Sequence, residues 1–236
     1  MKDINFSKYK LIIFDFDGTL YDYKGLPRNL IMFSFPRIFK VWAVQKVRKQ
    51  LKGIDFENKF TYEKEFFSLL CMKGKFKNQD EAEFWYKNFY MKKMIAVLKS
   101  KYTMRQNLVQ VFENLKALNK KIAIYSDYGN LSERLSAVGF NLELQKKLLN
   151  GIFSSEDFGC LKPVKRGFVV VAERLDVTPG ECLFIGDRED TDGVGAIESG
   201  MDFVQIKTYK NMTKEEKPQN LISFEDFTQQ VLSIKN

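Results

Sequence analysis

The spacing of apolar residues changes several times along the chain. Short runs typical of buried strands occupy five places, at 11–13, 121–125, 151–153, 182–185 and 202–206. Stretches with the period of amphipathic helices lie between and after them, at 105–118, 131–138, 164–175, 194–199 and 224–232. Strands that alternate with helices of this length predict crossover connections and a parallel sheet covered on both faces. The charged stretch 207–218 is predicted to be a surface loop.

The pattern between residues 21 and 103 is helical throughout. Apolar residues recur at helical spacing in two stretches: Phe35, Ile38, Phe39, Trp42 and Val47, and later Phe84, Phe89, Met94 and Val97. Gly53, Gly74 and the stretch 78–80 separate the helices. We interpret the two stripes as the core of a small helical bundle rather than as a surface that binds a ligand.

Charge sets the same segment apart. Residues 21–103 hold 18 Lys and Arg against 8 Asp and Glu, a net charge of +10, whereas the rest of the chain holds 20 and 22, a net charge of −2. Such a shift in composition favours a separate domain. The predicted fold is therefore α/β, with a parallel sheet built from 1–20 and 104–236 and a helical domain, 21–103, inserted after the first strand.

Composition excludes several kinds of chemistry. The 236 residues include no histidine, so Ser–His and Cys–His mechanisms are excluded, and any metal is expected to bind oxygen ligands, which favours Mg²⁺. Cys71, Cys160 and Cys182 are too widely spaced for a disulfide framework. Because the N-terminus lacks the order of a secretory signal and no uninterrupted apolar run approaches membrane-spanning length, we expect a cytoplasmic protein.

The most informative polar residues follow the first strand. Asp15 and Asp17 stand two residues apart, and Gly18 begins a turn. Because side chains alternate along a strand, both carboxylates would project the same way if the extended backbone continued to the turn. Like charges disfavour joint ionisation, so either one carboxyl takes up a proton or a hard divalent cation binds between them and their neighbours.

Three later strand ends also carry chemically useful groups. Ser126 and Asp127 follow the second strand, Lys162 lies in the loop after the third, and the acidic run 187–192 follows the fourth. Parallel sheets bind ligands outside the carboxyl ends of their strands, so these groups are expected to converge. Each alone has an ordinary explanation as a turn, a helix cap or a surface loop. Together they supply what phosphoryl transfer needs, which is a nucleophile, a second acid, a hydroxyl, a cation and metal ligands.

Four motifs resemble those of the haloacid dehalogenase-like superfamily. They are Asp15-Phe16-Asp17-Gly18-Thr19, then Ser126, then Lys162-Pro163, then Gly186-Asp187 through Asp192, in the order of the family and each after the expected strand. The resemblance covers residues 5–20 and 104–206. It implies a Rossmann-like, doubly wound core, and it identifies 21–103 as an α-helical cap that closes over the site and excludes water.

The resemblance also implies catalytic roles. Asp15 would be the nucleophile, and Asp17 the general acid and base. Mg²⁺ would be held by Asp15, the backbone carbonyl of Asp17 and Asp187, with Asp192 supporting the metal through its waters. Asp190 and Asp192 both qualify as the second acid near the metal. The pattern Gly-Asp-Arg-x-x-Thr-Asp favours Asp192 for this role, and Asp190 is then interpreted as a helix cap.

Contacts to the phosphoryl group are implied for a second set of residues. Ser126 would bond a phosphoryl oxygen, Lys162 would offset the negative charge, and Gly18 and Thr19 would shape the loop. Asp127 stands at a phosphate-binding position where asparagine is frequent in the family. The nearby cations are interpreted as surface charge: Arg188, Lys165 and Arg166.

Asp17 separates phosphatases from dehalogenases of the superfamily, which lack an acid at this place. We therefore expect a Mg²⁺-dependent phosphatase whose basic cap attracts a small phosphorylated metabolite. A phosphomutase would share every core residue and stays open. A membrane-surface role for the aromatic and basic segment 26–52 also stays open. No nucleic-acid partner is expected, because the positive charge belongs to the insertion and accompanies no known binding module.

Overall fold

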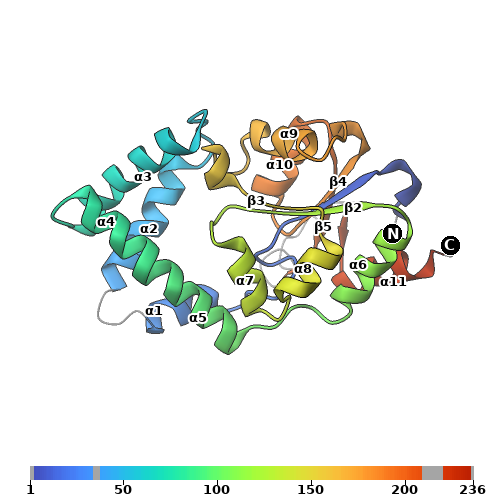
Figure 1. The fold of residues 1–236 in the computed structure, drawn as a ribbon, viewed down its shortest axis with the longest axis horizontal. Helices are drawn as coiled ribbons and strands as arrows, with labels where there is room; N and C mark the ends of the chain where they lie inside the picture. Colours follow the sequence, from blue (N-terminus) through green and yellow to red (C-terminus); the bar gives the residue numbers. More distant parts are fainter. Residues whose placement is uncertain (1–2, 34–37, 209–219, 235–236) are drawn as a thin grey trace.

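Six parallel strands form the central sheet of the computed structural model, which describes residues 3–33, 38–208 and 220–234 (Figure 1). In chain order the strands are β1 (Leu11–Phe14), β2 (Lys121–Ser126), β3 (Gly151–Ser154), β4 (Cys182–Gly186), β5 (Asp202–Ile206) and β6 (Leu221–Ile222). Across the sheet the order is β3-β2-β1-β4-β5-β6. The order changes direction at β1, which lies between β2 and β4, and ligands of such sheets bind at this point.

Successive residues of β1 face opposite sides of the sheet. Ile12 and Phe14 belong to the same apolar cluster as residues of α6 (Leu108–Ala117), α7 (Leu131–Ala137), α8 (Leu142–Leu148) and α11 (Phe224–Ser233). Leu11 and Ile13 pack instead with α9 (Lys165–Glu173) and α10 (Val194–Glu198). Burial on both faces explains why an uninterrupted apolar run precedes Asp15.

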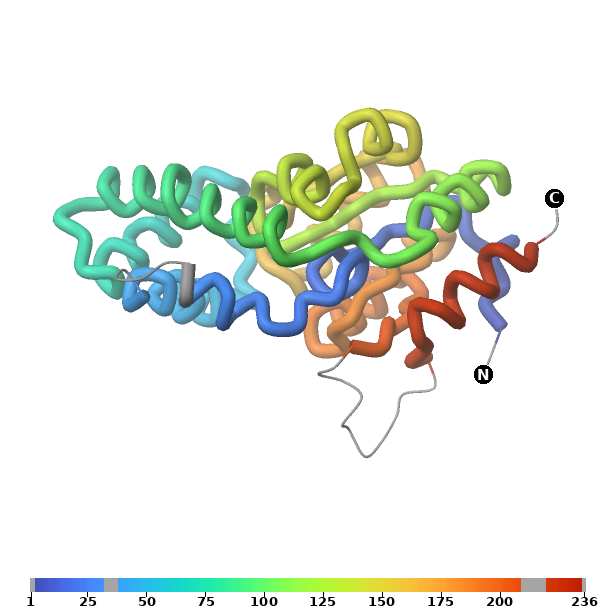
Figure 2. Tube along the Cα trace, turned by 90° about the horizontal axis from the view of Figure 1, so that it is seen from below, coloured from blue at the N-terminus to red at the C-terminus, as the bar shows by residue number. Residues whose placement is uncertain are grey.

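The helices between β1 and α6 form a lobe at one end of the molecule, on the left of Figure 1. They are α1 (Leu26–Phe33), α2 (Ile38–Leu51), α3 (Lys59–Gly74), α4 (Gln79–Trp85), the π-helical turn Tyr86–Tyr90 and α5 (Met91–Lys101). Asn58 and Asn78 cap α3 and α4, because their side chains accept hydrogen bonds from the backbone of Thr61 and Glu81. Figure 2 shows both chain termini at the end opposite this helical lobe.

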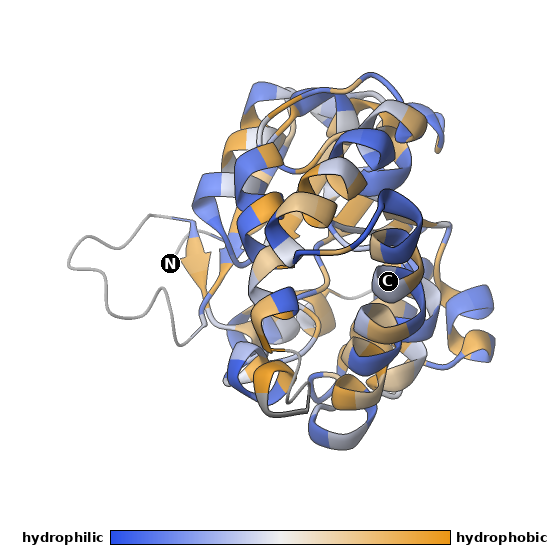
Figure 3. Ribbon diagram, turned by 90° about the vertical axis from the view of Figure 1, so that its left-hand side faces the viewer, coloured by the Kyte–Doolittle hydropathy of each residue, from blue (hydrophilic) through white to orange (hydrophobic). Residues whose placement is uncertain are grey.

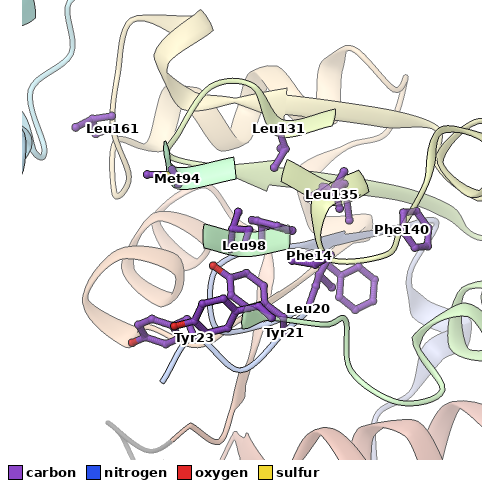
Figure 4. Packing of buried hydrophobic residues seen from close by; sticks show 14 of the residues in the cluster. Phe14, Leu20, Tyr21, Tyr23, Met94, Leu98, Leu131, Leu135, Phe140 and Leu161 are labelled. Carbon is purple, nitrogen blue, oxygen red and sulfur yellow. The ribbon is translucent and has the colours of Figure 1, made fainter. Parts of the chain in front are cut away.

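Apolar side chains join the helical lobe to the rest of the molecule. Figure 4 shows Met94 and Leu98 of α5 near Leu131 and Leu135 of α7, and all four belong to the cluster that continues beneath the sheet. Figure 3, coloured by hydropathy, shows hydrophobic and hydrophilic residues interspersed around the helices, as expected for helices with one buried face. Buried packing therefore positions the lobe over the carboxyl end of the sheet.

Two short elements, β6 and α8, were not predicted. The two residues of β6 are too few to show a strand period. Helix α8 has only Gln145 and Leu148 buried, which leaves no apolar stripe to recognise. Most of the predicted loop at 207–218 lies outside the described residues, and so does Phe35.

The predicted aromatic stripes are wrong at three positions. Phe39, Trp42 and Phe84 are 52%, 55% and 68% exposed. Helix α2 instead buries an aliphatic face that includes Val41 and Val44, and the helix packs against α3. The other described members of the stripes are buried or partly buried, namely Ile38, Val47, Phe89, Met94 and Val97.

The segment 26–52, considered above for a membrane-surface role, forms α1 and α2 on the two sides of residues 34–37. The aliphatic face of α2 is occupied by packing within the lobe, whereas Phe39 and Trp42 are exposed, so a membrane-surface role of this segment stays a prediction. Within the described ranges, no helix is both long and apolar enough to cross a membrane.

Candidate active site

Neighbouring strands bring the polar residues together at the carboxyl edge of the sheet. The end of β1 pairs with Ile124 of β2 on one side and with Ile185 of β4 on the other. Asp15 follows immediately and donates its backbone N–H to the Ile185 carbonyl at 2.8 Å. Ser126 ends β2 and Asp187 comes directly after β4. The strand-end groups that the sequence singles out therefore meet where parallel sheets bind ligands.

Asp15, Asp187 and Asp192 form a buried acidic cluster. One carboxylate oxygen from each lies within 4.8 Å of the other two, and the residues are 6%, 3% and 2% exposed. The Lys162 Nζ donates to Asp15 Oδ1 at 2.6 Å and to Asp192 Oδ1 at 2.8 Å. Three carboxylates around this one ammonium leave an excess of negative charge in a place that water barely reaches.

Lys162 reaches the acidic cluster through an aromatic slot. Its Nζ lies 5.3 Å from the ring centre of Tyr125 on β2 and 5.1 Å from that of Phe184 on β4. The Asp127 carboxylate accepts hydrogen bonds from the Lys162 backbone N–H at 2.9 Å and from Ser155 Oγ at 2.8 Å. Asp127, which the family resemblance places at the phosphate, thus fixes the loop that carries Lys162.

Burial and repulsion raise the carboxyl pKa values of the cluster. Burial, opposed by Lys162, raises the pKa of Asp15 to about 7, and Asp192 adds to the rise. Burial, followed by repulsion from Asp15 and Asp192, raises the pKa of Asp187 well above its usual range. Burial alone would lower the pKa of Lys162, but the Asp15 and Asp192 carboxylates outweigh this effect and raise it. A divalent cation would relieve the repulsion among the three acids.

The backbone beside the acidic cluster leaves no room for side chains. Gly18 has a φ of +92°, and a Cβ there would lie 2.6 Å from Asp187 Oδ2 and 2.6 Å from a ring carbon of Tyr23. A Cβ on Gly186 would lie 2.5 Å from Asp192 Oδ2.

The three carboxylates of the acidic cluster are the hard oxygen donors that Mg²⁺ prefers, so the donor set fits this ion. The backbone carbonyl of Asp17 as a further ligand stays a prediction.

Asp17 lies outside the acidic cluster. The Arg134 guanidinium donates to its Oδ2, and the Tyr21 hydroxyl donates to its Oδ1 at 2.5 Å. β1 ends at Phe14 and the backbone bends at Phe16, between the two acids. The two carboxylates of the first motif are therefore bound by different cations, Lys162 for Asp15 and Arg134 for Asp17.

Arg134 is a site residue that the sequence did not reveal. It lies on α7, is fully buried, and donates to Ser126 Oγ and to the Tyr128 carbonyl, both at 3.2 Å. Ser126 Oγ also lies 3.5 Å from Asp17 Oδ2. The Arg134 guanidinium thus contacts both Asp17, the second acid of the first motif, and Ser126, whose hydroxyl is predicted to bond a phosphoryl oxygen. An arginine on an amphipathic helix gives no sequence signal for this, because the same pattern is typical of surface charge.

Arg105 is a second unpredicted residue, and it holds the loop after β1. It donates to the carbonyl oxygens of Thr19 at 2.9 Å and Gly18 at 3.0 Å. The buried Thr19 hydroxyl in turn donates to Asp15 Oδ2 at 3.2 Å. Hydrogen bonds to backbone carbonyls and to the Asp15 side chain therefore both hold the loop that carries the first motif.

Asp190 does not cap a helix, contrary to the expectation. It lies inside the π-helical turn Glu189–Gly193, whose N-cap is Arg188, and it is exposed to solvent. Its carboxylate accepts hydrogen bonds from Arg188 and from Lys52 of the helical lobe, each at 2.7 Å. Asp192 is the acid that this turn directs into the cluster.

Arg166 is also not a free surface charge. It forms an ion pair of 2.6 Å with Asp55, which precedes α3 in the helical lobe.

Comparison with known proteins places most of the chain in one family. The family model of a haloacid dehalogenase-like hydrolase matches residues 9–200. The glyceraldehyde 3-phosphate phosphatase of Methanopyrus kandleri is 40% identical over 73 residues, which are 31% of this chain and 30% of the relative. That of Methanocaldococcus jannaschii is 29% identical over 112 residues, 46% of this chain and 47% of the relative. The chain thus matches less than half the length of these relatives.

Solved structures with different activities share the fold. A HAD phosphatase from Thermococcus onnurineus has a TM-score of 0.58 at 22% identity, covering 95% of this chain and 98% of its own. A β-phosphoglucomutase from Clostridium difficile has a TM-score of 0.60 at 18% identity, covering 95% and 97%. A 2-haloacid dehalogenase from Pseudomonas syringae has a TM-score of 0.58 at 18% identity, covering 95% and 98%. These likenesses confirm the predicted α/β fold but do not choose an activity. Because the family model covers most of its length, this chain belongs to the haloacid dehalogenase-like hydrolases.

Proposed function

We propose that this chain is a Mg²⁺-dependent phosphatase that hydrolyses a small phosphorylated metabolite through a phosphoryl group carried by Asp15. The observation that supports this most directly is the acidic cluster with Lys162, set beside a second acid, Asp17, that the cluster does not include. The names of the two curated relatives point to the same activity. In this proposal residues 1–20 and 104–236 form the catalytic domain, and 21–103 form its cap.

The acidic cluster and Lys162 would prepare the attack. Mg²⁺, held by Asp15, Asp187 and Asp192, would offset the negative charge that otherwise keeps a carboxylate away from a phosphate. Lys162, which already contacts the Asp15 carboxylate, would balance charge on the phosphoryl oxygens.

Asp15 and Asp17 would carry the chemistry in two steps. A carboxylate oxygen of Asp15 forms a bond to phosphorus while the bond from phosphorus to the alcohol oxygen breaks, and Asp17 gives that oxygen its proton. In the second step Asp17 takes a proton from water, whose oxygen attacks phosphorus. The bond between phosphorus and the Asp15 oxygen breaks as the bond to the water oxygen forms, so inorganic phosphate leaves and the Asp15 carboxylate is restored.

Replacing Asp15 by asparagine tests this proposal. Because an amide is a poor nucleophile, Asp15→Asn should lower kcat for p-nitrophenyl phosphate with Mg²⁺ by about a thousandfold or more. Asp202→Asn makes the same change at the amino end of β5, where the carboxylate contacts Lys8 and Tyr9, and should keep its activity. Mass spectrometry of acid-quenched wild-type protein should find one phosphoryl group on Asp15. Full activity in Asp15→Asn would refute the proposal.

The cations around the cavity support a phosphomutase less well than a phosphatase. Such an enzyme needs cations that hold a second phosphate, yet two of the three cations that line the cavity beside Asp17 are already paired, Arg134 with Asp17 and Arg188 with Asp190. Incubation with hexose phosphates separates the two activities. A phosphatase releases inorganic phosphate and free sugar, whereas a mutase yields an isomeric sugar phosphate.

A further inference from the structure

A cavity of about 380 Å³ opens beside Asp17. It lies between the helical lobe and the rest of the chain, which contains the six strands and is called the sheet-bearing part below. Asp17 and Arg134 are among the residues that line it. If Asp17 protonates the leaving oxygen, the alcohol part of the substrate must extend from that oxygen into this cavity. The side chains that line the cavity therefore indicate whether that alcohol is polar or apolar.

The walls of the cavity are mainly apolar. They include side chains of α1, α2 and α5, namely Leu26, Leu30, Ile31, Val41, Trp42 and Met94. Trp42 also lines an outer depression, which combines apolar side chains with three lysines: Ile38, Phe39, Ala43, Lys46, Lys73 and Lys75. Figure 4 shows Met94 and Tyr23, two of the lining residues, at the junction of the lobe with the core.

Several polar groups of the lining already have partners. The Gln45 amide donates to the Tyr90 hydroxyl at 3.0 Å and to the Tyr128 hydroxyl at 3.2 Å. Arg188 is paired with Asp190. Among the lining residues, Lys46 keeps an exposed position at the outer wall.

Such a lining discriminates strongly against a polyol. A sugar hydroxyl that gives up water without gaining a partner costs about 1–3 kcal/mol. A methylene group that leaves water gains about 0.8 kcal/mol. The same cavity that favours an aliphatic chain therefore rejects a sugar of similar size.

We propose that the substrate is a phosphate monoester of an apolar alcohol, whose aliphatic or aromatic body fills this cavity. The proposal rests on the phosphatase function proposed above and names its substrate class. It assigns the specificity of the enzyme to the aliphatic side chains of α1 and α2 that line the same cavity as Asp17.

Chain length and hydroxyl content test the proposal with the wild-type enzyme and Mg²⁺. From ethyl through butyl to hexyl phosphate, kcat/KM should rise about two- to fourfold per added methylene, the latter corresponding to about 0.8 kcal/mol. n-Propyl phosphate and glycerol 3-phosphate form a matched pair that differs by two hydroxyl groups, and propyl phosphate should be hydrolysed at least about tenfold more efficiently. A flat series, or a preference for glycerol 3-phosphate or glucose 6-phosphate, would overturn the proposal.

A variant locates the effect in the cavity. Leu30→Gln places an amide in the apolar wall, where the leucine is 4% exposed, and should reduce the ratio of hexyl to ethyl phosphate kcat/KM at least about fivefold. Leu142→Gln makes the same change at a residue of α8 that is 58% exposed and outside the cavity, and should leave the ratio unchanged. An unaltered ratio in a folded Leu30→Gln protein would contradict the proposal, and the wild-type series decides alone if that variant does not fold.

Acetyl phosphate separates failure of this inference from failure of the proposed function. Its acyl group is too small to depend on the cavity walls. Hydrolysis of acetyl phosphate without any alkyl preference overturns the substrate class and leaves the phosphatase intact. An enzyme that hydrolyses neither acetyl phosphate nor any of the esters overturns both.

Discussion

Asp15 and Asp17 are chemically identical, and their surroundings give them different tasks. Asp15 is buried among acids with Lys162 as its partner, whereas the side chain of Asp17 is 25% exposed and is held by Arg134. Only Asp17 also lines the cavity where a leaving group would lie. The position of Asp17 beside this cavity is therefore what supports its proposed role as the proton donor.

Arg134→Met should affect both activity and stability. Asp17, Ser126 and the Tyr128 carbonyl would lose a common donor, so we expect kcat/KM to fall about ten- to a hundredfold and the free energy of unfolding to fall by roughly 2 kcal/mol. Steady-state kinetics and urea denaturation measure the two effects. Arg134→Lys keeps the charge without the guanidinium fork, so it should recover part of each. Wild-type kcat/KM in Arg134→Met would show that this contact does not position the acid.

At the scale of elements, short irregular segments decide where the functional groups lie. The π-helical turn after β4 turns Asp192 inward and Asp190 outward. The 3₁₀ turn Ser155–Phe158 ends at Gly159, whose carbonyl accepts a hydrogen bond from Phe56 of the helical lobe at 2.9 Å. The loop that leads to Lys162 is therefore also a docking point for the start of α3.

Gly159→Ala should weaken this docking point. Gly159 has a φ of +73°, and a Cβ there would lie 2.2 Å from the Asn58 carbonyl oxygen, so either the cap of α3 or the loop must move. We expect a loss of roughly 2–4 kcal/mol in the free energy of unfolding, measured by urea denaturation. Gly139→Ala is a matched control, because its φ is +100° and its Cβ would meet nothing within 4 Å. It should lose only about 1–2 kcal/mol from backbone strain. Equal losses would show that contact with the helical lobe contributes nothing.

At the scale of the whole molecule, the two oppositely charged parts of the chain meet through ion pairs. Arg48, Lys52 and Lys59 of the helical lobe pair with Glu156, Asp190 and Asp157 of the sheet-bearing part. The more exposed pairs, Lys52–Asp190 and Lys59–Asp157, contribute about 0–1 kcal/mol each, whereas the side chains of Arg48 and Glu156 are only 8% and 14% exposed. Apolar packing between α5 and α7 adds to the contact. Ion pairs and apolar packing therefore both join the two parts of the chain.

Mg²⁺ should stabilise the fold, and more strongly as the pH rises. In the metal-free protein the folded pKa of Asp15 is raised to about 7, above the unfolded value of about 3.9, so stability falls as the pH rises through this window. Mg²⁺ needs the deprotonated carboxylates and offsets their repulsion. At a concentration a hundred times its Kd it should add about 2.7 kcal/mol at pH 7.5 and clearly less at pH 5.

Urea denaturation with and without Mg²⁺ at the two pH values measures this effect. Asp187→Asn removes a carboxylate of the acidic cluster and should abolish the stabilisation. Asp190→Asn, at an exposed acid outside the cluster, should retain it. An equal effect of Mg²⁺ in the wild type and in Asp187→Asn would place the metal elsewhere.

The sequence by itself determined the strand order along the chain and the residues that stand at the strand ends. Apolar runs buried on both faces are visible in a sequence, and Asp15 and Asp187 directly follow two of them, β1 and β4, while Lys162 lies in the loop after the partly buried edge strand β3. Tertiary structure alone decided which distant groups meet them. Arg134 reaches Asp17 across 117 positions, and α2 buries aliphatic side chains while Trp42 stays exposed. The physical reason is that periodicity records which face of an element is apolar, whereas the partner of a buried charge and the walls of a cavity depend on how separate elements pack.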